Sequence, residues 1–196
     1  MKANVGMVYP VYAPVSAYTP GTSITYSTGA VAGEAVSANL TWNRNDGHFY
    51  GDDVELDSDN SVTGYTLSVE LSGIKDTVRA ALLGETLASS EYSISDAAAP
   101  DVGFGYIRVM RETNASTGKV ETAYEGYWYH KMKFGISSEE TRTKEGGGIE
   151  WRVPTLEGIG AGVSLDSSGK KYFAVHETFS TEASAKSWLN GKAGIS

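Results

Sequence analysis

The sequence contains no cysteine, and this absence excludes both disulfide bonds and thiolate metal sites. Long apolar runs are also missing. The first residues, MKANVGMVYPVYAPV, are interrupted by Pro10 and Pro14, and no run approaches the ~20 residues of a membrane helix. We therefore expect a protein that is made and folded in the cytoplasm, with no signal peptide and no membrane insertion.

Basic residues are scarce: 16 Lys and Arg stand against 24 Asp and Glu, which gives a net charge of −8. Proteins that bind nucleic acid rely on Lys and Arg to neutralise phosphates. The charge balance therefore argues against a nucleic-acid-binding protein.

Metal and nucleotide motifs are incomplete. The glycine run at Gly158–Gly162 lacks the spacing of a nucleotide-binding loop, so we interpret it as a tight bend. The segment Asp57–Ser61 begins like a calcium loop, but Val62 stands where a glycine is required and Ser68 where the bidentate Glu is required. We interpret this segment as part of a solvated acidic loop, and we expect neither a metal nor a cofactor.

The three histidines, His48, His130 and His176, are accompanied by no nucleophile or zinc motif. His130 has the same parity as Trp128 and Met132, which favours a core histidine that is hydrogen-bonded to backbone. We do not expect an enzyme.

The sequence is rich in residues that suit β structure, with 12 Tyr and 23 Gly but only 5 Pro. Two arms rich in Tyr, Val, Ile and Trp flank the cluster TNASTGK, and together they predict a long β-hairpin over Gly103–Phe134. The first arm is apolar at both parities, which predicts cover on both faces. In the second arm, one parity is apolar (Tyr124, Trp128, Met132, Phe134) and the other is charged and phenolic (Glu125, Tyr127, Tyr129, Lys131, Lys133).

Other segments surround this hairpin. Residues 1–30 predict an irregular, extended segment that adds a strand at a sheet edge or reaches a neighbour. Clean alternation predicts half-buried strands over Ala35–Asn43 and Tyr65–Leu71, joined by a long acidic loop over 44–62. A helix is predicted over Ile74–Leu83, capped by Ser72 and stopped by Gly84.

The remainder predicts shorter elements. We expect a short strand at Glu91–Ile94, a loop over Gly135–Gly148, and a strand from Ile149 to Thr155 with Pro154 at an edge or bulge. A turn at Asp166–Lys170 then precedes a strand over Lys171–Phe179 and a short helix over Thr181–Asn190 that Gly191 stops. These elements describe a single domain over 1–196, a mostly antiparallel β-sandwich or barrel with one packed helix.

Several segments together resemble the major tail proteins of long-tailed bacteriophages. They are AVSANLTWNRNDGHFYGDD, GYTLSVELSGIKDTVRAALLGE, APDVGFGYIRVMR, YEGYWYHKMKF and SSEETRTKEGGGIEWRVPTLEG, in the family's order over roughly residues 34–162. The resemblance implies a tail-tube β-sandwich with a flanking helix, which assembles into stacked hexameric rings that conduct phage DNA. It also implies a place in the virion tail, with the tape measure and tail terminator proteins as partners and DNA passing through without specific binding.

Two sets of candidate residues follow. The loop over 44–62 is expected to reach the adjacent ring, with Phe49 and Tyr50 as aromatic anchors; the alternative is a mobile loop. The candidate inter-ring contact comprises Arg44, His48, Phe49, Tyr50, Asp52 and Asp53. The candidate lumen-facing residues are Glu125, Tyr127, Tyr129, Lys131 and Lys133.

Two other functions remain open on the sequence. One is a β-sandwich binding module that recognises carbohydrate or a host surface, which predicts Trp and Tyr clustered on one face of a monomer. The other is a tube protein of the type VI secretion kind, for which the same fold is expected.

Overall fold

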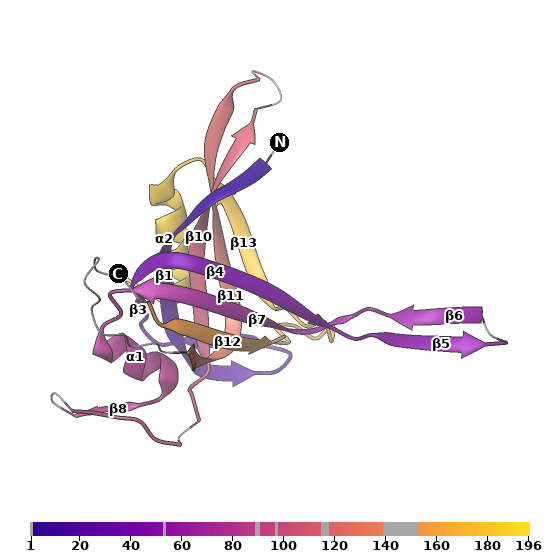
Figure 1. Cartoon of the computed structure of the whole chain (residues 1–196), viewed down its shortest axis with the longest axis horizontal. Helices are drawn as coiled ribbons and strands as arrows, with labels where there is room; N and C mark the ends of the chain where they lie inside the picture. The colour runs from indigo at the N-terminus through magenta and orange to yellow at the C-terminus, as the bar shows by residue number, and fades with distance from the viewer. Residues whose placement is uncertain (1, 53, 89–90, 97, 115–117, 139–152) are drawn as a thin grey trace, which may run out of the picture.

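The computed structural model describes residues 2–52, 54–88, 91–96, 98–114, 118–138 and 153–196. These residues form a mostly antiparallel β fold with two helices (Figure 1). The predicted fold class, mostly β with a packed helix and a short C-terminal helix, is confirmed at this level.

One large sheet contains most of the strands, and all its pairings are antiparallel. Its main path runs through β2 (Ser23–Tyr26), β1 (Lys2–Thr19), β10 (Val102–Thr113), β11 (Val120–Ser138), β12 (Thr155–Ala161), β7 (Val62–Ser72) and β4 (Glu34–Arg44). Two further strands lie off this path: β13 (Ala174–Phe179) pairs with β11, and β3 (Ala30–Val31) pairs with β1.

The predicted central hairpin is confirmed as β10 and β11, which pair from Val102–Met132 to Thr113–Val120. Both faces of β10 are covered, as the sequence predicts. Phe104 and Tyr106 belong to one buried cluster, enclosed by β4, β7, β12 and α1 (Asp76–Leu83). Ile107 belongs to a second cluster, under α2 (Glu182–Ala193).

The single apolar parity predicted for the second arm is wrong, because β11 carries a bulge. Phe104 pairs with Tyr129 and Val102 with Met132, so two residues of β11 stand opposite one of β10. An extra residue in one strand reverses the faces beyond it. Trp128 is therefore buried under α2, whereas Met132 and Phe134 are buried in the other cluster.

The N-terminal segment is not irregular: it forms β1, which pairs with β10 and, over Val15–Thr19, with β2. Among the described residues, 2–8 pair with β10 alone, so the predicted strand at a sheet edge is present in this part of β1. Two register shifts let an 18-residue strand accommodate its irregular sequence, one of them between Val8 and Val11 around Pro10. Within that shift Tyr9 has a left-handed φ of 55°, and its hydroxyl donates a hydrogen bond of 2.8 Å to Oδ1 of Asn190 in α2. The N-terminal segment thus anchors the second helix.

Both helices differ from the prediction at one end. The first begins after Lys75 rather than at Ser72, which ends β7, and Gly84 ends it in the left-handed conformation as expected. The second begins after Thr181, whose side chain accepts a hydrogen bond from the Ser184 N–H. It passes through Gly191 and ends at Gly194, so the predicted stop at Gly191 is wrong.

The glycines of β12 form no bend. They lie in the strand, where their missing side chains make room for rings of neighbouring strands: a Cβ at Gly160 would overlap the Tyr65 ring, and one at Gly158 would lie 2.8 Å from Phe134 Cε1. Close approach of a ring to a sheet is one reason for glycine within a strand.

The two alternating strands are confirmed as β4 and β7. Tyr65, Leu67, Val69 and Leu71 of β7 are buried. In β4, Ala38 and Leu40 pack on the same cluster, whereas Val36 is exposed beside a register shift between Ala35 and Ser37.

The remaining predictions have mixed outcomes. The short strand is confirmed as β9 (Glu91–Ser93), which pairs with β8 (Thr86–Ala88). The turn at Asp166–Lys170 is present, and the strand after it is shorter than predicted. Residues 135–138 continue β11 rather than beginning a loop; the rest of the predicted loop, and residues 149–152 of the predicted strand, lie outside the described residues.

Candidate functional site

The segment predicted as a loop over 44–62 is a β-hairpin. β5 (Gly47–Gly51) pairs with β6 (Val54–Asp59), and Figure 1 shows the pair projecting from the end of β4 and β7. The Asn45 N–H donates to the Ser61 carbonyl at 2.8 Å, which links this pairing to that of β4 and β7. We call residues 44–62 the arm.

Sequence reasoning missed these strands because the arm has no buried face. Alternation identifies a strand only where one face is apolar and covered, and β5 and β6 are exposed on both faces at all positions whose burial the structure describes. The signal that was available is the pair of glycines, Gly47 and Gly51, that bound a short aromatic run.

The arm exposes large apolar side chains. Phe49 is 65% exposed and Tyr50 60%, and Val54 and Leu56 are exposed to a similar extent. Of the other predicted contact residues, Arg44 donates from Nη1 to the Asn60 carbonyl at 3.4 Å, Asp52 has a left-handed φ of 50°, and Asp53 lies outside the described residues. A two-stranded ribbon is marginally stable on its own in water. Because these apolar side chains are exposed, a partner can contact them and stabilise the ribbon.

His48 stabilises the arm by joining its two strands. Its Nδ1 lies 2.9 Å from Oε1 of Glu55 on the opposite strand, and its Nε2 lies 3.0 Å from Oδ1 of Asp46. The hydrogen bond with Glu55, followed by that with Asp46, raises the pKa of His48 above its usual value.

A groove of about 320 Å³ lies at the root of the arm. Its walls come from the end of β4, the middle of β11, and the segment leading into β13. They consist of Trp42, Tyr127, Tyr129, Lys171, Tyr172, Phe173, Ala174 and His176. Trp42 is 40% exposed, and its ring meets those of Tyr65 and Phe173 edge to face, with centroids 5.7 and 5.8 Å apart.

Sequence reasoning missed the groove because its walls come from three segments that lie far apart in the chain. The sequence shows Trp42, Tyr172 and Phe173 only as aromatic members of separate predicted strands. The pairing of β11 with β13 brings the segment before β13 to Tyr127, and Trp42 of β4 meets Phe173 through its ring.

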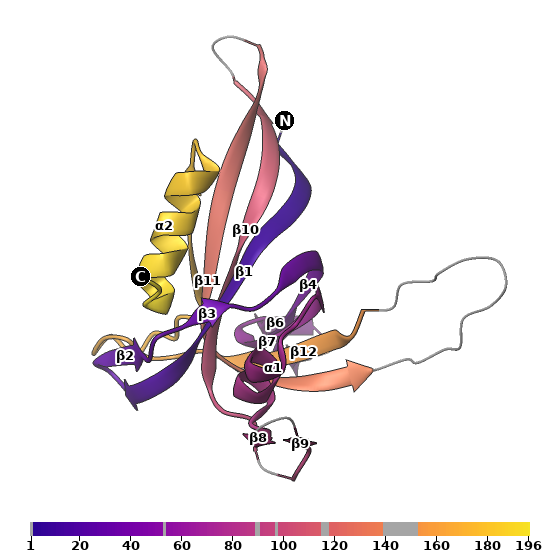
Figure 2. The same ribbon diagram turned by 90° about the vertical axis from the view of Figure 1, so that its left-hand side faces the viewer.

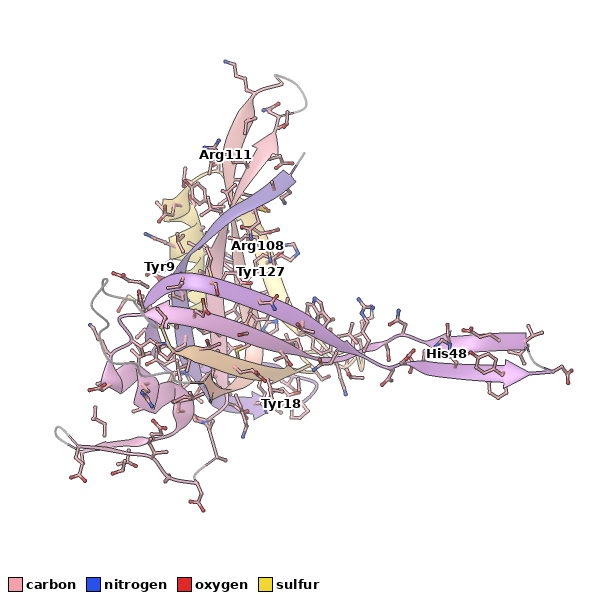
Figure 3. The ribbon with its side chains drawn as sticks, in the orientation of Figure 1. Tyr9, Tyr18, His48, Arg108, Arg111 and Tyr127 are labelled. Atoms are coloured by element: carbon pink, nitrogen blue, oxygen red, sulfur yellow. The ribbon has the colours of Figure 1, made fainter. Side chains whose placement is uncertain are left out.

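A network of charges lies beside the groove on the same face of the sheet. Glu125 is only 5% exposed, and its carboxylate lies 3.2 Å from His176 Nδ1 and 3.8 Å from both Arg108 Nη1 and Lys2 Nζ. The Arg108 guanidinium stacks 4.5 Å from the centroid of Tyr127, and the two side chains are labelled in Figure 3, with His48 far out on the arm. Burial raises the pKa of Tyr127 to about 12.

The predicted lumen-facing residues do not share one exposed face. Tyr129 is 1% exposed, and burial raises its pKa, so its prediction as a surface residue is wrong; Glu125 is likewise buried. Beyond the bulge, Lys131 and Lys133 lie on the other face of β11, where their Nζ atoms are 3.0 and 4.0 Å from carboxylate oxygens of Asp101.

The three histidines lie apart: His48 is on the arm, His176 lines the groove, and His130 lies near Lys192 of α2. His130 is half-buried rather than part of the core, so its interpretation as a core residue is wrong. Burial lowers its pKa to about 4, with a further effect from Lys192. Its backbone N–H donates to the Phe173 carbonyl at 3.1 Å. Among the residues that the structure describes, no three His, Asp or Glu side chains are grouped as metal ligands.

No helix in the described part of the chain combines the length and apolarity needed to cross a bilayer. When the sequence is compared with models of known protein families, none matches, and no curated protein matches it either.

Proposed function

We propose that this chain is a structural protein of the bacteriophage tail-tube type, whose copies join into hexameric rings that stack into a tube for DNA. The observation that carries the proposal is a four-stranded region, β1-β10-β11-β13, with an open edge on each side. Among the described residues, β13 pairs only with β11, and residues 2–8 of β1 pair only with β10. An open strand edge presents unpaired N–H and C=O groups, which can pair with a strand of another chain.

The strand directions suit such pairing. Three antiparallel pairings separate β1 from β13, so the two edge strands run in opposite directions. Joining β13 of one copy to β1 of the next therefore continues the antiparallel pattern. Because the two edges differ, the contact is head-to-tail, which is the kind that closes into a ring. Six copies per ring is what the family resemblance implies.

One face of this region is covered by α2, and the other becomes polar towards the hairpin turn, beyond the buried Phe104 and Tyr106. Figure 2 shows α2 lying along the first face, where Leu189 and Ala185 are buried against Ile107 and Trp128. Near the hairpin turn, the register places the exposed Glu112 and Glu121 on the opposite face. In a ring, the part of this face near the hairpin turn would line the lumen, whereas the groove lies further along β11. A protein of net charge −8 repels phosphates, which favours passage of DNA without binding.

The arm supports the stacking of rings. It extends from the sheet and exposes Phe49 and Tyr50, and aromatic groups within a polar rim are typical of contact hot spots. The proposal places the protein in the virion tail, with itself, the tape measure and the tail terminator as partners.

Native mass spectrometry and negative-stain electron microscopy of the purified chain test the proposal. We expect rings at low concentration and tubes at millimolar concentration, because edge pairing and stacking are both concentration-dependent. A strictly monomeric species at millimolar concentration, unchanged by salt or time, would contradict it.

A carbohydrate-binding module is the second candidate, and one observation favours it. Trp42, Tyr127, Tyr172 and Phe173 gather in one groove on a single chain, and exposed aromatic clusters are typical of binding surfaces. A monomeric protein whose tryptophan fluorescence responds to soluble oligosaccharides would support this function over the first.

A further inference from the structure

We propose that the groove at the root of the arm, lined by Trp42, Tyr127, Lys171, Tyr172, Phe173 and His176, receives the Phe49–Tyr50 segment of the arm of a second copy. This inference rests on the proposed assembly and names the surface that accepts the arm.

The chemistry of the two surfaces matches. The arm presents two adjacent aromatic side chains, and the groove offers aromatic walls that include the half-exposed Trp42. Edge-to-face and offset ring contacts of this kind are favourable beyond the area that they bury. The occupant of the groove is therefore expected to be aromatic.

The charges are also complementary. The arm carries six acidic residues, Asp46, Asp52, Asp53, Glu55, Asp57 and Asp59, against one arginine, Arg44. Among the residues that the structure describes, the lining of the groove contains Lys171 and His176 and no acid. Nearby, Lys170 and Arg108 add positive charge, whereas Asp166 accepts a hydrogen bond from Tyr172 and Glu125 is buried among Lys2, Arg108 and His176.

The occupant belongs to another copy because a chain cannot place its arm in its own groove. Trp42 lines the groove two residues before the arm begins, and Figure 1 shows β5 and β6 extending away from the sheet. Bending the arm back would break its pairing from Gly47–Asp59 to Gly51–Val54. From Arg44 to Gly51 the arm spans about 23 Å at ~3.3 Å per residue, which carries Phe49 and Tyr50 away from the groove of their own chain.

Site-directed disulfide trapping tests the contact, and the absence of native cysteine makes the probe specific. One variant carries Tyr50→Cys on the arm, and the other carries Lys171→Cys in the groove; both sites are exposed, so folding is unaffected. The matched control replaces Lys171→Cys by Lys133→Cys, an exposed lysine on the other face of β11. The variants are mixed, allowed to assemble, and oxidised. Phe49→Cys serves as a second arm probe.

We expect the Tyr50–Lys171 or Phe49–Lys171 pair to give at least about tenfold more cross-linked dimer than the control pair, because docking raises the effective concentration of the two thiols to millimolar or above. Assembled wild-type protein together with no excess over the Lys133 control would overturn the groove contact and leave the proposed assembly intact. Loss of the excess on addition of oligosaccharide, without disassembly, would also overturn it and assign the groove to a glycan. A wild-type protein that remains monomeric would overturn both proposals.

Discussion

At the scale of single residues, the burial of His130 makes the stability of the fold depend on pH. Its folded pKa of about 4 lies below the ordinary histidine value of about 6.5, so the unfolded chain binds more protons between these two values. Folding stability from this group is complete above pH 6.5 and is lost as pH falls towards 4.

We therefore expect the wild-type protein to lose about 2 kcal/mol more free energy of unfolding between pH 7 and pH 5 than a His130→Gln variant. Urea unfolding at the two pH values measures the difference, and the comparison cancels the pH dependence that the two proteins share. Equal losses in the two proteins would show that His130 is protonated in the folded state.

Single residues also mark the limit of what the sequence predicts. Alternation in β7 is sufficient to identify its buried side chains, because a period of two is a local property. The bulge opposite Gly103 is not local: Gly103 leaves room for Trp128 of the partner strand, whose ring a Cβ at that position would overlap. Only the paired strand reveals it, and it reverses the faces predicted for Lys131 and Lys133.

At the scale of elements, the central hairpin, β4, β7 and the body of both helices were predictable, since each buries a face that repeats along its own sequence. The position of β1 was not, because its prolines and register shifts obscure the alternation, and its partner β10 follows about a hundred residues later. The strands of the arm were missed for another reason, which is that neither of them has a buried face.

Removal of the arm provides an element-scale prediction. Replacing residues 46–60 by Asn-Gly joins Asn45 to Ser61 through a two-residue turn suited to paired strands. We expect a melting temperature within a few degrees of wild type, since the described arm side chains are exposed. We also expect rings that no longer stack.

Thermal unfolding and electron microscopy of the arm-deleted chain measure the two effects. Tubes of normal length would show that the arm has no part in stacking. A large fall in melting temperature would show instead that the arm stabilises the fold.

At the scale of the whole molecule, charge predicts how the protein behaves towards DNA. With a net charge of −8 and glutamates on the free face of the four-stranded region, we expect no measurable affinity for duplex DNA at physiological salt. Chromatography on immobilised DNA checks this, with the isolated ring and the assembled tube as separate samples. Retention of either above ~100 mM salt would contradict a lumen that repels phosphates, because phosphate contacts weaken steeply over that range.

Contacts between the arm and the groove would make the two ends of a stack of rings different. The arm and the groove are different surfaces on the same chain, so a stack built from them has polarity. One end displays unfilled grooves, which are aromatic and cationic, and the other displays free arms, which are aromatic and acidic. A protein that blocks growth at one end therefore does not fit the other, and two chemically opposite caps are needed to close the same filament.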